Sequence, residues 1–292
     1  MSQTSRVHEK LPALLPLMGQ ALLAKKAPFP RGGELPDLAE QIEGVRLTPE
    51  RLERYNALCA FETGEMLPIT APHVLAAPLH TALLTRPEFP LKALGLIHIS
   101  NRILQYRPIP SDAEMSIHVG MGRALWVPKG VEFNLMTSVR VEGELAWEEV
   151  STIFSRGPVD PEAESTLPRT AEYRTMSPNL EEEWELPGNL GRSYASVSGA
   201  YNPIHLWALT ARLFGFQRPI IHGMWSLARS AASLQGVLRA ETASIDIQFS
   251  RPILLPETVL FEAQESSQGH SFTGATRSKG LCFSGTARSP LR

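Results

Sequence analysis

The sequence predicts an α+β protein made of two repeats, each a central helix wrapped by an antiparallel sheet. Three observations support this. Segments with the alternation of half-buried strands follow one another near the C-terminal end, and the first half also places an apolar helix before four strand-like segments. The tripeptide Arg-Pro-Ile follows the first of these strands in both halves. The recurrence of one plan with one local motif indicates a duplicated fold.

The first element along the chain is a short apolar segment, "LPALLPLMGQALLAKK". Lys10 precedes it as in a secretion signal, but Pro12, Pro16 and Gln20 interrupt it. Its apolar run is also shorter than the ~20 residues that a membrane span requires. We therefore expect an amphipathic N-terminal helix and a cytoplasmic protein.

The first repeat is expected within a domain over residues 1–160. "PHVLAAPLHTALLTR" predicts an apolar helix, and Pro108 suits the end of the strand before it because proline cannot donate to a ladder. The predicted helix and strands are Pro72–Arg86, Ile97–Tyr106, Glu114–Gly120, Val131–Val141 and Glu144–Phe154.

The second repeat is expected over residues 181–292, after a linker at 161–180 with its boundary near Pro168. Proline, serine, threonine and charge replace apolar periodicity in that linker. Small residues follow one face of the predicted helix, which favours close packing on a sheet. The predicted elements are a helix at Gly223–Arg239 and strands at Ala243–Ser250, Thr258–Ser267, His270–Arg277 and Leu281–Arg288, read as an antiparallel meander.

Composition narrows the class of ligand. The 292 residues are 43% hydrophobic and carry a net charge of -2 without long like-charge runs, so neither nucleic acid nor an anionic membrane is an expected partner. A small neutral or anionic ligand fits better. Cys59 and Cys282 have no metal-ligand spacing, which favours free thiols in a reducing compartment.

The segment "YASVSGAYNPIH" contains the strongest chemical signal. Asn202 is a favoured N-cap, Pro203 suits a first helical position and Gly215 suits a stop, so a helix is expected over residues 203–214. His205 would then lie in the first turn, where backbone N–H groups lower the pKa of an imidazole. A neutral imidazole there can accept a proton, although a lone histidine more often only hydrogen-bonds within its turn.

A second short segment, "IIHGM", weighs against that ordinary interpretation. Gly223 begins the next predicted helix, and a glycine there lets a ligand oxygen approach the backbone N–H at the positive helix end. An imidazole beside such a donor suits a polarised carbonyl. A zinc site formed by His205, His222 and His270 has no supporting local spacing, so no metal is expected.

Together these residues resemble the MaoC-like hydratase and dehydratase family of the hot-dog superfold. The resemblance rests on Y-A-x-x-S-G-x-x-N-P-I-H, on H-G-M with its histidine 17 positions later, and on "FSRPILLPETV" downstream. It covers roughly residues 193–259 and implies a double hot dog. The first half lacks both motifs and resembles the degenerate hot dog of two-domain members, whose expected role is to wall the acyl channel.

The resemblance implies reversible hydration of 2-enoyl thioesters to (R)-3-hydroxyacyl thioesters, with coenzyme A or an acyl carrier protein as the thiol. No cofactor is expected, and the chain would be a monomeric pseudo-dimer or a homodimer. Carried over, His205 is the general acid/base, Asn202 orders the turn, and the N–H of Gly223 donates to the thioester carbonyl. The expected substrate contacts are Ser198, Tyr201, His222 and Met224.

The chain departs from the family pattern at Ala200, where an Asp is expected to share the catalytic water with the histidine. Loss of one acid–base group commonly costs a factor of ~10²–10⁴ in rate. Three explanations stay open: an introduced Asp→Ala change, a natural binding subunit without turnover, or another carboxylate such as Glu62 or Glu65. Both glutamates are more simply interpreted as solvated loop residues.

Two further sets of residues bear on the alternatives. A hot-dog thioesterase would need a water-activating group on its central helix, where the sequence offers Ser226, Arg229 and Ser230, and no G-x-S-x-G elbow is present. The phosphates of coenzyme A or of a carrier arm could meet Arg123, Lys129 or Arg192, although solvated surface is the ordinary interpretation of each.

Overall fold

The computed structural model describes residues 3–23, 26, 29–30, 32–157, 163, 178–239, 241–267 and 269–290. Its strands are β1 (Thr4–His8), β2 (Leu38–Val45), β3 (Ile97–Gln105), β4 (Met115–Val127), β5 (Gly130–Val141), β6 (Glu144–Arg156), β7 (Leu180–Leu186), β8 (Ala243–Phe249), β9 (Glu257–Ser266), β10 (Gly269–Thr276) and β11 (Gly280–Arg288). Its helices are α1 (Leu14–Leu23), α2 (Pro49–Cys59), α3 (Pro72–Thr85), α4 (Leu190–Ser198), the 3-10 turn η2 (Pro203–His205), α5 (Ala208–Arg212), α6 (Gly223–Ser233) and α7 (Gln235–Leu238).

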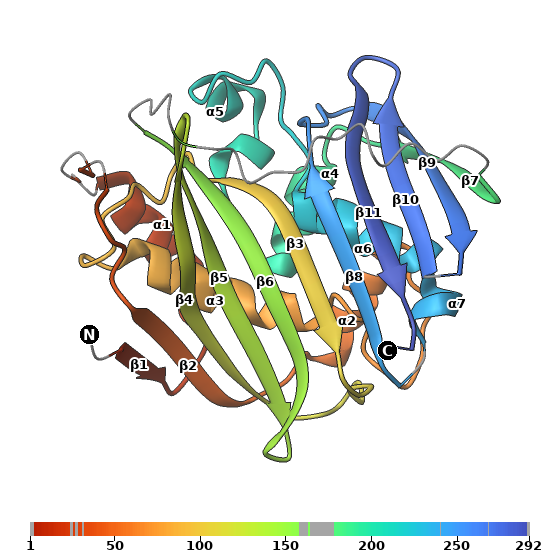
Figure 1. The fold of residues 1–292 in the computed structure, drawn as a ribbon, viewed down its shortest axis with the longest axis horizontal. Helices are drawn as coiled ribbons and strands as arrows, with labels where there is room; N and C mark the ends of the chain where they lie inside the picture. Colours follow the sequence, from red (N-terminus) through yellow and green to blue (C-terminus); the bar gives the residue numbers. More distant parts are fainter. Residues whose placement is uncertain are drawn as a thin grey trace.

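All the described strands form one sheet, in the order β1-β2-β4-β5-β6-β3-β8-β11-β10-β9-β7. Figure 1 shows the sheet crossing the molecule with the long helices α3 and α6 behind it. The two halves join where β3 pairs antiparallel with β8, with Asn101 opposite Ile247 and Ile103 opposite Ile245. The fold is therefore a double hot dog, as predicted, with one central helix for each half of the sheet.

Backbone contacts around Arg-Pro-Ile support the predicted duplication. In the first repeat the N–H groups of Tyr106 and Arg107 both donate to the carbonyl of Ala146, at 2.9 and 3.4 Å. In the second repeat Ser250 and Arg251 donate in the same way to a single carbonyl, that of Cys282, at 2.8 and 3.1 Å. The two copies of the motif thus turn their chains through the same backbone geometry.

The predicted meander is wrong for the first strand of the second repeat. β9, β10 and β11 follow one another in the sheet, but β8 pairs with β11 rather than with β9. The first repeat has the same order, because β3 pairs with β6 and not with β4. Each first strand thereby lies at the inner side of its half, where β3 and β8 can pair with one another.

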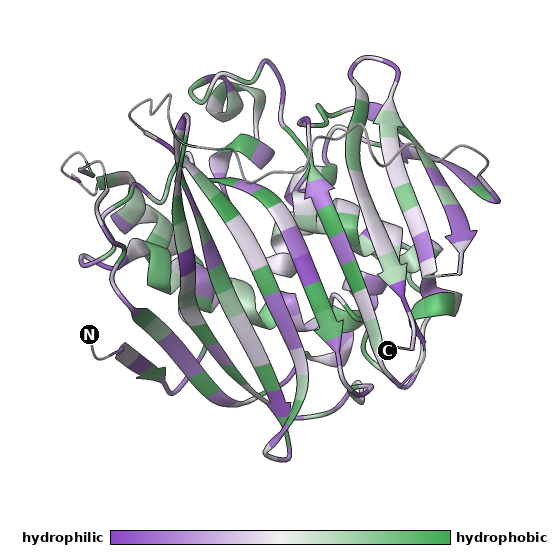
Figure 2. Ribbon diagram, viewed as in Figure 1, coloured by the Kyte–Doolittle hydropathy of each residue, from purple (hydrophilic) through white to green (hydrophobic). Residues whose placement is uncertain are grey.

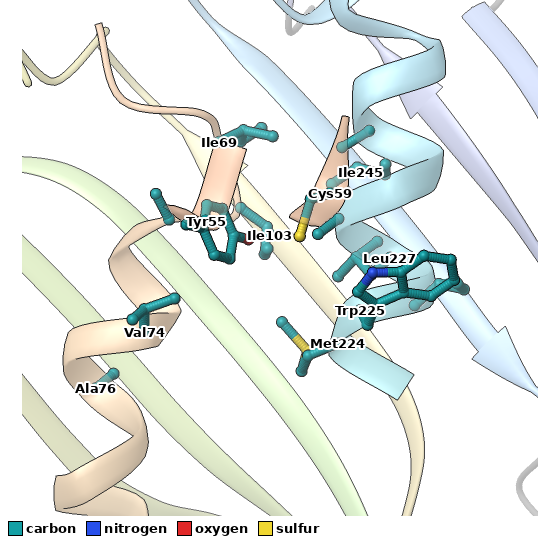
Figure 3. Close-up of a cluster of buried hydrophobic side chains, with 14 of the residues drawn as sticks. Tyr55, Cys59, Ile69, Val74, Ala76, Ile103, Met224, Trp225, Leu227 and Ile245 are labelled. Atoms are coloured by element: carbon teal, nitrogen blue, oxygen red, sulfur yellow. The ribbon is translucent and has the colours of Figure 1, made fainter. Parts of the chain in front are cut away.

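The core lies between the helices and the inner face of the sheet. Hydrophobic and hydrophilic residues alternate along the central strands in Figure 2, as a sheet with one covered face requires. Figure 3 shows side chains of α3 and α6 within one buried cluster, with Val74 on one helix, Leu227 on the other and Tyr55 of α2 between them. Ile103 of β3 and Ile245 of β8 are both fully buried beneath them. The same hydrophobic cluster therefore joins the two repeats.

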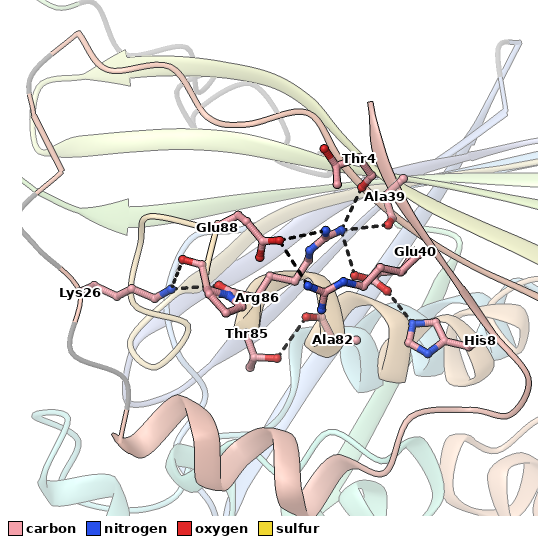
Figure 4. Close-up of polar contacts among 11 residues, drawn as sticks. Thr4, His8, Lys26, Ala39, Glu40, Ala82, Thr85, Arg86 and Glu88 are labelled. Carbon is pink, nitrogen blue, oxygen red and sulfur yellow. Dashed lines mark hydrogen bonds and ion pairs between the residues drawn. The ribbon is translucent and has the colours of Figure 1, made fainter. Parts of the chain in front are cut away.

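Arg86, the residue that follows α3, fixes the outer strands of the first repeat. Its guanidinium is 2% exposed and donates to the carbonyls of Thr4 and Ala39 and to the carboxylate of Glu40 (Figure 4). A second nitrogen of the guanidinium reaches Glu88 at 3.3 Å. These contacts attach β1 and β2 to the end of the central helix, and neither strand was predicted from the sequence.

Several boundaries differ from the sequence prediction. The expected N-terminal helix is present as α1, and the expected helix at Gly223–Arg239 is interrupted at Leu234, between α6 and α7. The predicted linker lies almost entirely outside the described residues, so the domain boundaries stay a prediction. Within the part of the chain that the structure describes, no helix is both long and apolar enough to cross a membrane.

Candidate active site

The Ser-Gly turn fixes the backbone that leads into the candidate site. α4 ends at Ser198, and Gly199 follows in the left-handed region with φ 81°. The Ser198 hydroxyl donates to the carbonyl of Tyr194 at 2.9 Å and accepts from the N–H of Ala200 at 3.2 Å. A Cβ at Gly199 would lie 2.5 Å from Leu14 Cδ1. The turn therefore requires glycine for its left-handed conformation, and a larger residue would also displace the Leu14 side chain.

The predicted continuous helix over residues 203–214 is wrong. The chain instead forms η2, a short irregular stretch, and α5. The carbonyl of Ile204 accepts from the N–H of Ile220 at 3.1 Å, and the carbonyl of Leu206 accepts from Arg192 at 2.8 Å. Both carbonyls would have to accept bonds within a continuous α-helix, so these tertiary contacts replace it.

His205 lies at the end of η2, and one of its two ring nitrogens forms a hydrogen bond within the protein. Nδ1 lies 2.8 Å from the carbonyl oxygen of Ile220, which can only accept, so Nδ1 carries the proton. Nε2 of the neutral ring then has a free lone pair. Desolvation lowers the pKa of His205 to about 4, although its bond to Ile220 opposes the shift. The neutral form that can accept a proton therefore predominates near pH 7.

His222 stacks directly on His205. The ring centroids are 3.6 Å apart and the planes differ by 26°. Nε2 of His222 donates to the carbonyl of Ala200 at 2.8 Å, whereas its buried Nδ1 has no partner among the described residues. Desolvation, and then repulsion by His205, hold the pKa of His222 well below its ordinary value. Two neutral imidazoles thus lie together, each with a lone pair.

Gly223 begins α6 directly after His222. A Cβ on Gly223 would lie 2.8 Å from Cζ of Phe249 and 2.9 Å from its Cε2. The glycine is therefore needed for the close approach of the Phe249 ring, a reason that the sequence alone did not supply. Met224 follows, 6% exposed, and Figure 3 places it in the buried cluster between the two central helices.

The structure brings together four predicted site residues: His205 and His222 by their stacking, Ala200 by its bond to His222, and Gly223 by its place in the chain. Asn202 caps η2, its Oδ1 accepting from the N–H of Ile204 at 3.4 Å. The remaining predicted residues are less directly connected. Tyr201 is half-buried beside Ala200, and the hydroxyl of Ser198 is used within the turn.

The candidates for a replacement acid lie on an exposed loop after α2. Glu62 forms an exposed ion pair with Arg239, and its backbone N–H donates to the side chain of Gln235 at 3.1 Å. Glu65 is also exposed. The interpretation of both glutamates as solvated loop residues agrees with these positions.

Of the three candidate phosphate contacts, Arg192 lies beside the motif. Its guanidinium donates to the carbonyl of Leu206 and lies 4.0 Å from the ring centroid of Trp207, a residue that is 56% exposed. Arg123 lies elsewhere, in a groove that it shares with Asp246. Lys129 lies in the turn between β4 and β5. Arg192 is therefore the cation that holds the loop carrying His205.

A second polar cluster was missed by the sequence analysis. His73 and His80 on α3 and Glu149 on β6 place their ligand atoms within 4.8 Å of one another, and this is the set of possible metal ligands found among the described residues. The predicted strand alternation could have revealed it, because Glu149 is in phase with the buried Trp147 and Ser151.

Together the fold and the site define a double hot-dog protein with its histidine site in the second repeat, and the comparisons agree. Residues 170–280 match the model of the MaoC like domain. The chain is 30% identical to 3-hydroxyacyl-thioester dehydratase X of Mycobacterium tuberculosis over 251 residues, 86% of this chain and 89% of the relative. The chain therefore belongs to the MaoC-like dehydratase family.

Solved structures extend this result to the whole double fold. The crystal structure of HtdX from Mycobacterium tuberculosis superposes with a TM-score of 0.74 at 28% identity, covering 86% of this chain and 99% of that one. A MaoC-like dehydratase from Phytophthora capsici gives 0.70 at 18% identity, with 87% and 95% covered. The 12:0-ACP thioesterase of Umbellularia californica gives 0.52 at 9% identity, with 86% and 96% covered, a likeness of fold alone.

Proposed function

We propose that the protein is a hydro-lyase that interconverts 2-enoyl thioesters and (R)-3-hydroxyacyl thioesters of coenzyme A or an acyl carrier protein. The observation that carries the proposal is the orientation of His205. Its Nδ1 is held by the Ile220 carbonyl, so a neutral Nε2 is available as a proton acceptor. The family and the activity named for the Mycobacterium tuberculosis relative support the same reaction class.

In the proposed hydration, His205 Nε2 accepts a proton from water as the water oxygen bonds to the β-carbon. Negative charge then develops on the thioester oxygen, where the backbone N–H of Gly223 at the start of α6 donates to it. Return of the proton to the α-carbon completes the addition. His222 supports the geometry by stacking on His205 and by fixing the Ala200 carbonyl.

Ala200 limits the rate in this proposal. Its side chain provides no acid–base group, so His205 must manage the water without the carboxylate of the family pattern. The turn itself is intact, since Ala200 makes both of its backbone contacts, to Ser198 and to His222. We therefore expect thioester binding to be preserved and turnover to be slower than with an aspartate by ~10²–10⁴-fold.

Ala200 also favours a second candidate, an acyl-thioester-binding subunit without turnover. A thioesterase is less well supported, because Arg229 is bound to Glu182 at 2.8 Å and Ser230 donates to the Ser226 carbonyl at 2.9 Å. Under each of these functions, hydro-lyase, binding subunit or thioesterase, one chain supplies both repeats. The buried free thiols Cys59 and Cys282 support a reducing compartment, and we propose the cytoplasm.

The test is to follow the absorbance of an enoyl thioester with the protein as it stands, with Ala200→Asp, with His205→Ala, and with both changes. We expect Ala200→Asp to accelerate the reaction ~10²–10⁴-fold and His205→Ala to abolish the gain. Binding of a non-reactive acyl thioester without turnover in any variant would instead support the binding subunit. Release of free thiol would support the thioesterase.

A further inference from the structure

The buried cluster in the first repeat centres on Glu149, whose side chain is fully buried. Both carboxylate oxygens approach Nδ1 of His73, at 2.8 and 2.9 Å, and one accepts from Nδ2 of Asn101 at 2.7 Å. Nε2 of His80 lies 4.0 Å from the other oxygen. The cluster lies between α3 and the strands β3 and β6 of the first repeat, which Figure 1 labels.

The two histidines converge on this carboxylate from different turns of one helix. His73 and His80 are seven residues apart on α3, so their backbone positions differ by ~10.5 Å along the axis. Their ring centroids are nevertheless only 5.3 Å apart. The side chains therefore lean toward one another and toward Glu149, as ligands of a shared centre do.

A buried carboxylate requires a compensating cation. Among the described residues, Glu149 has no ion pair with lysine or arginine, and its charged partners are the two histidines. The carboxylate is therefore compensated either by hydrogen bonds from these imidazoles or by a metal ion that the three groups hold between them.

Unpaired polar atoms next to the carboxylate favour the metal ion. Asn101 is 2% exposed, and its Oδ1 has no partner among the described residues although its Nδ2 bonds to Glu149. Nε2 of His98 is likewise buried and unpaired. A simple pair of His73 with Glu149 would leave the Asn101 oxygen without a partner. A hydrated cation beside the carboxylate would give that oxygen an ordered partner.

We propose that His73 Nδ1, His80 Nε2 and a Glu149 oxygen bind a divalent cation of the zinc class. Zinc accepts this nitrogen and oxygen donor set, with tetrahedral ligand atoms ~3.3 Å apart at bonds of ~2.0–2.1 Å. Nδ1 of His73 is already within that distance of Glu149, whereas the ligand atoms of the three residues, which lie within 4.8 Å of one another, must close by up to ~1.5 Å. Water or the hydroxyl of Thr137, 2.8 Å from His80 Nε2, completes the set.

The site would be structural, because it attaches the central helix to the sheet. Solvent reaches its edge, since the side chains of His73 and His80 are 11% and 10% exposed. The proposal is independent of the reaction proposed for the second repeat. The proposed site differs from the sequence prediction of no metal. That prediction was based on His205, His222 and His270, whereas the proposed ligands lie in the first repeat.

The experiment removes metal from the full-length protein with a chelator and titrates Co²⁺, reading stoichiometry and the visible d–d bands of a tetrahedral site. We expect one equivalent per chain, and at least a tenfold loss of affinity in His80→Asn and in Glu149→Gln. His205→Asn is the matched control, because the stacked histidine pair is the other imidazole cluster. It should still bind one equivalent.

Two outcomes would overturn the proposal. One is a folded, chelator-treated protein that binds no Co²⁺. The other is binding that survives His80→Asn but disappears in His205→Asn. If the buried variants do not fold, X-ray absorption of the Co²⁺-loaded parent protein decides the question, because the site requires two imidazole nitrogens and carboxylate oxygen around the metal.

Discussion

Replacement of Gly223 by alanine tests the start of α6 as the carbonyl donor. The new methyl group would lie 2.8, 2.9 and 3.2 Å from three carbons of the Phe249 ring. Carbon atoms pack favourably at ~3.5–4.0 Å, so the ring must withdraw by ~0.7 Å. His98 packs against the same ring in an edge-on contact, with the ring centroids 5.3 Å apart. If the ring does not withdraw fully, the start of α6 must shift and carry the backbone N–H of Gly223 with it.

The expected magnitude has two parts. Overpacking costs ~1–3 kcal/mol, and the better helix propensity of alanine returns up to ~1 kcal/mol, so we expect a net destabilisation of up to ~2 kcal/mol. Alanine keeps the backbone N–H, so the rate falls only if that donor is displaced from the thioester oxygen, by up to the factor of ~10²–10³ in kcat that loss of an oxyanion donor costs. The rate should therefore fall far more than the stability does.

The assay compares kcat, KM and thermal unfolding for Gly223→Ala in both the parent protein and the Ala200→Asp background. Gly236→Ala is the matched control, because Gly236 lies in the neighbouring helix α7 and a Cβ there would have nothing within 4 Å. We expect the control to have an unchanged rate and up to ~1 kcal/mol greater stability. A Gly223→Ala protein with the parent rate would refute the reasoning that crowding against Phe249 displaces this N–H from the thioester oxygen.

Four further outcomes follow from the site. Because desolvation lowers the pKa of His205 to about 4, kcat/KM should stay level from pH 7 to 5, and an acid limb near pH 6.5 would contradict this. The unfolded chain binds that proton near pH 6.5, so stability should fall between pH 6.5 and 4, and His205→Gln should flatten the fall measured by denaturant unfolding. Arg192→Ala should lower kcat at least fivefold, because it removes the hydrogen bond to the Leu206 carbonyl. Arg102→Ala is the control, since it breaks only an exposed ion pair with Asp246 and should leave kcat unchanged. Equal kcat values in the two variants would show that Arg192 does not hold the loop of His205. Asn202→Ala should cost ~1 kcal/mol by uncapping η2, and unaltered thermal unfolding would argue against the cap.

Strands that face a core on one side were predictable because burial imposes alternation. Along β8, Ile245 and Ile247 are buried while the intervening Asp246 is more exposed. β7 was missed because it is an edge strand, where only Trp184 and Leu186 are buried and the residues between and before them are mostly acidic. The order of the strands in the sheet could not be predicted either. Hydrophobic alternation shows which face of a strand is buried, but not which strand it pairs with.

The motif residues were found from the sequence, but their backbone was predicted incorrectly. Asn202 and Pro203 give a real helix start, so local propensity favoured a full helix. Contacts with residues distant in the sequence then took the carbonyls of Ile204 and Leu206. The orientation of His205 depends on Ile220 in the same way. Contacts between residues far apart in the sequence leave no local pattern. Periodicity therefore could not predict that Nδ1 of His205 carries the proton.

The pairing of β3 with β8 inside one chain has a genetic consequence. In a symmetric pair of identical subunits, any substitution at the seam occurs twice, and a change that suits one active site alters its copy as well. Here Asn101 and Ile247 face one another as different residues encoded at different positions. Each half can therefore accumulate its own substitutions, and one half has become free to lose the motif that the other still carries.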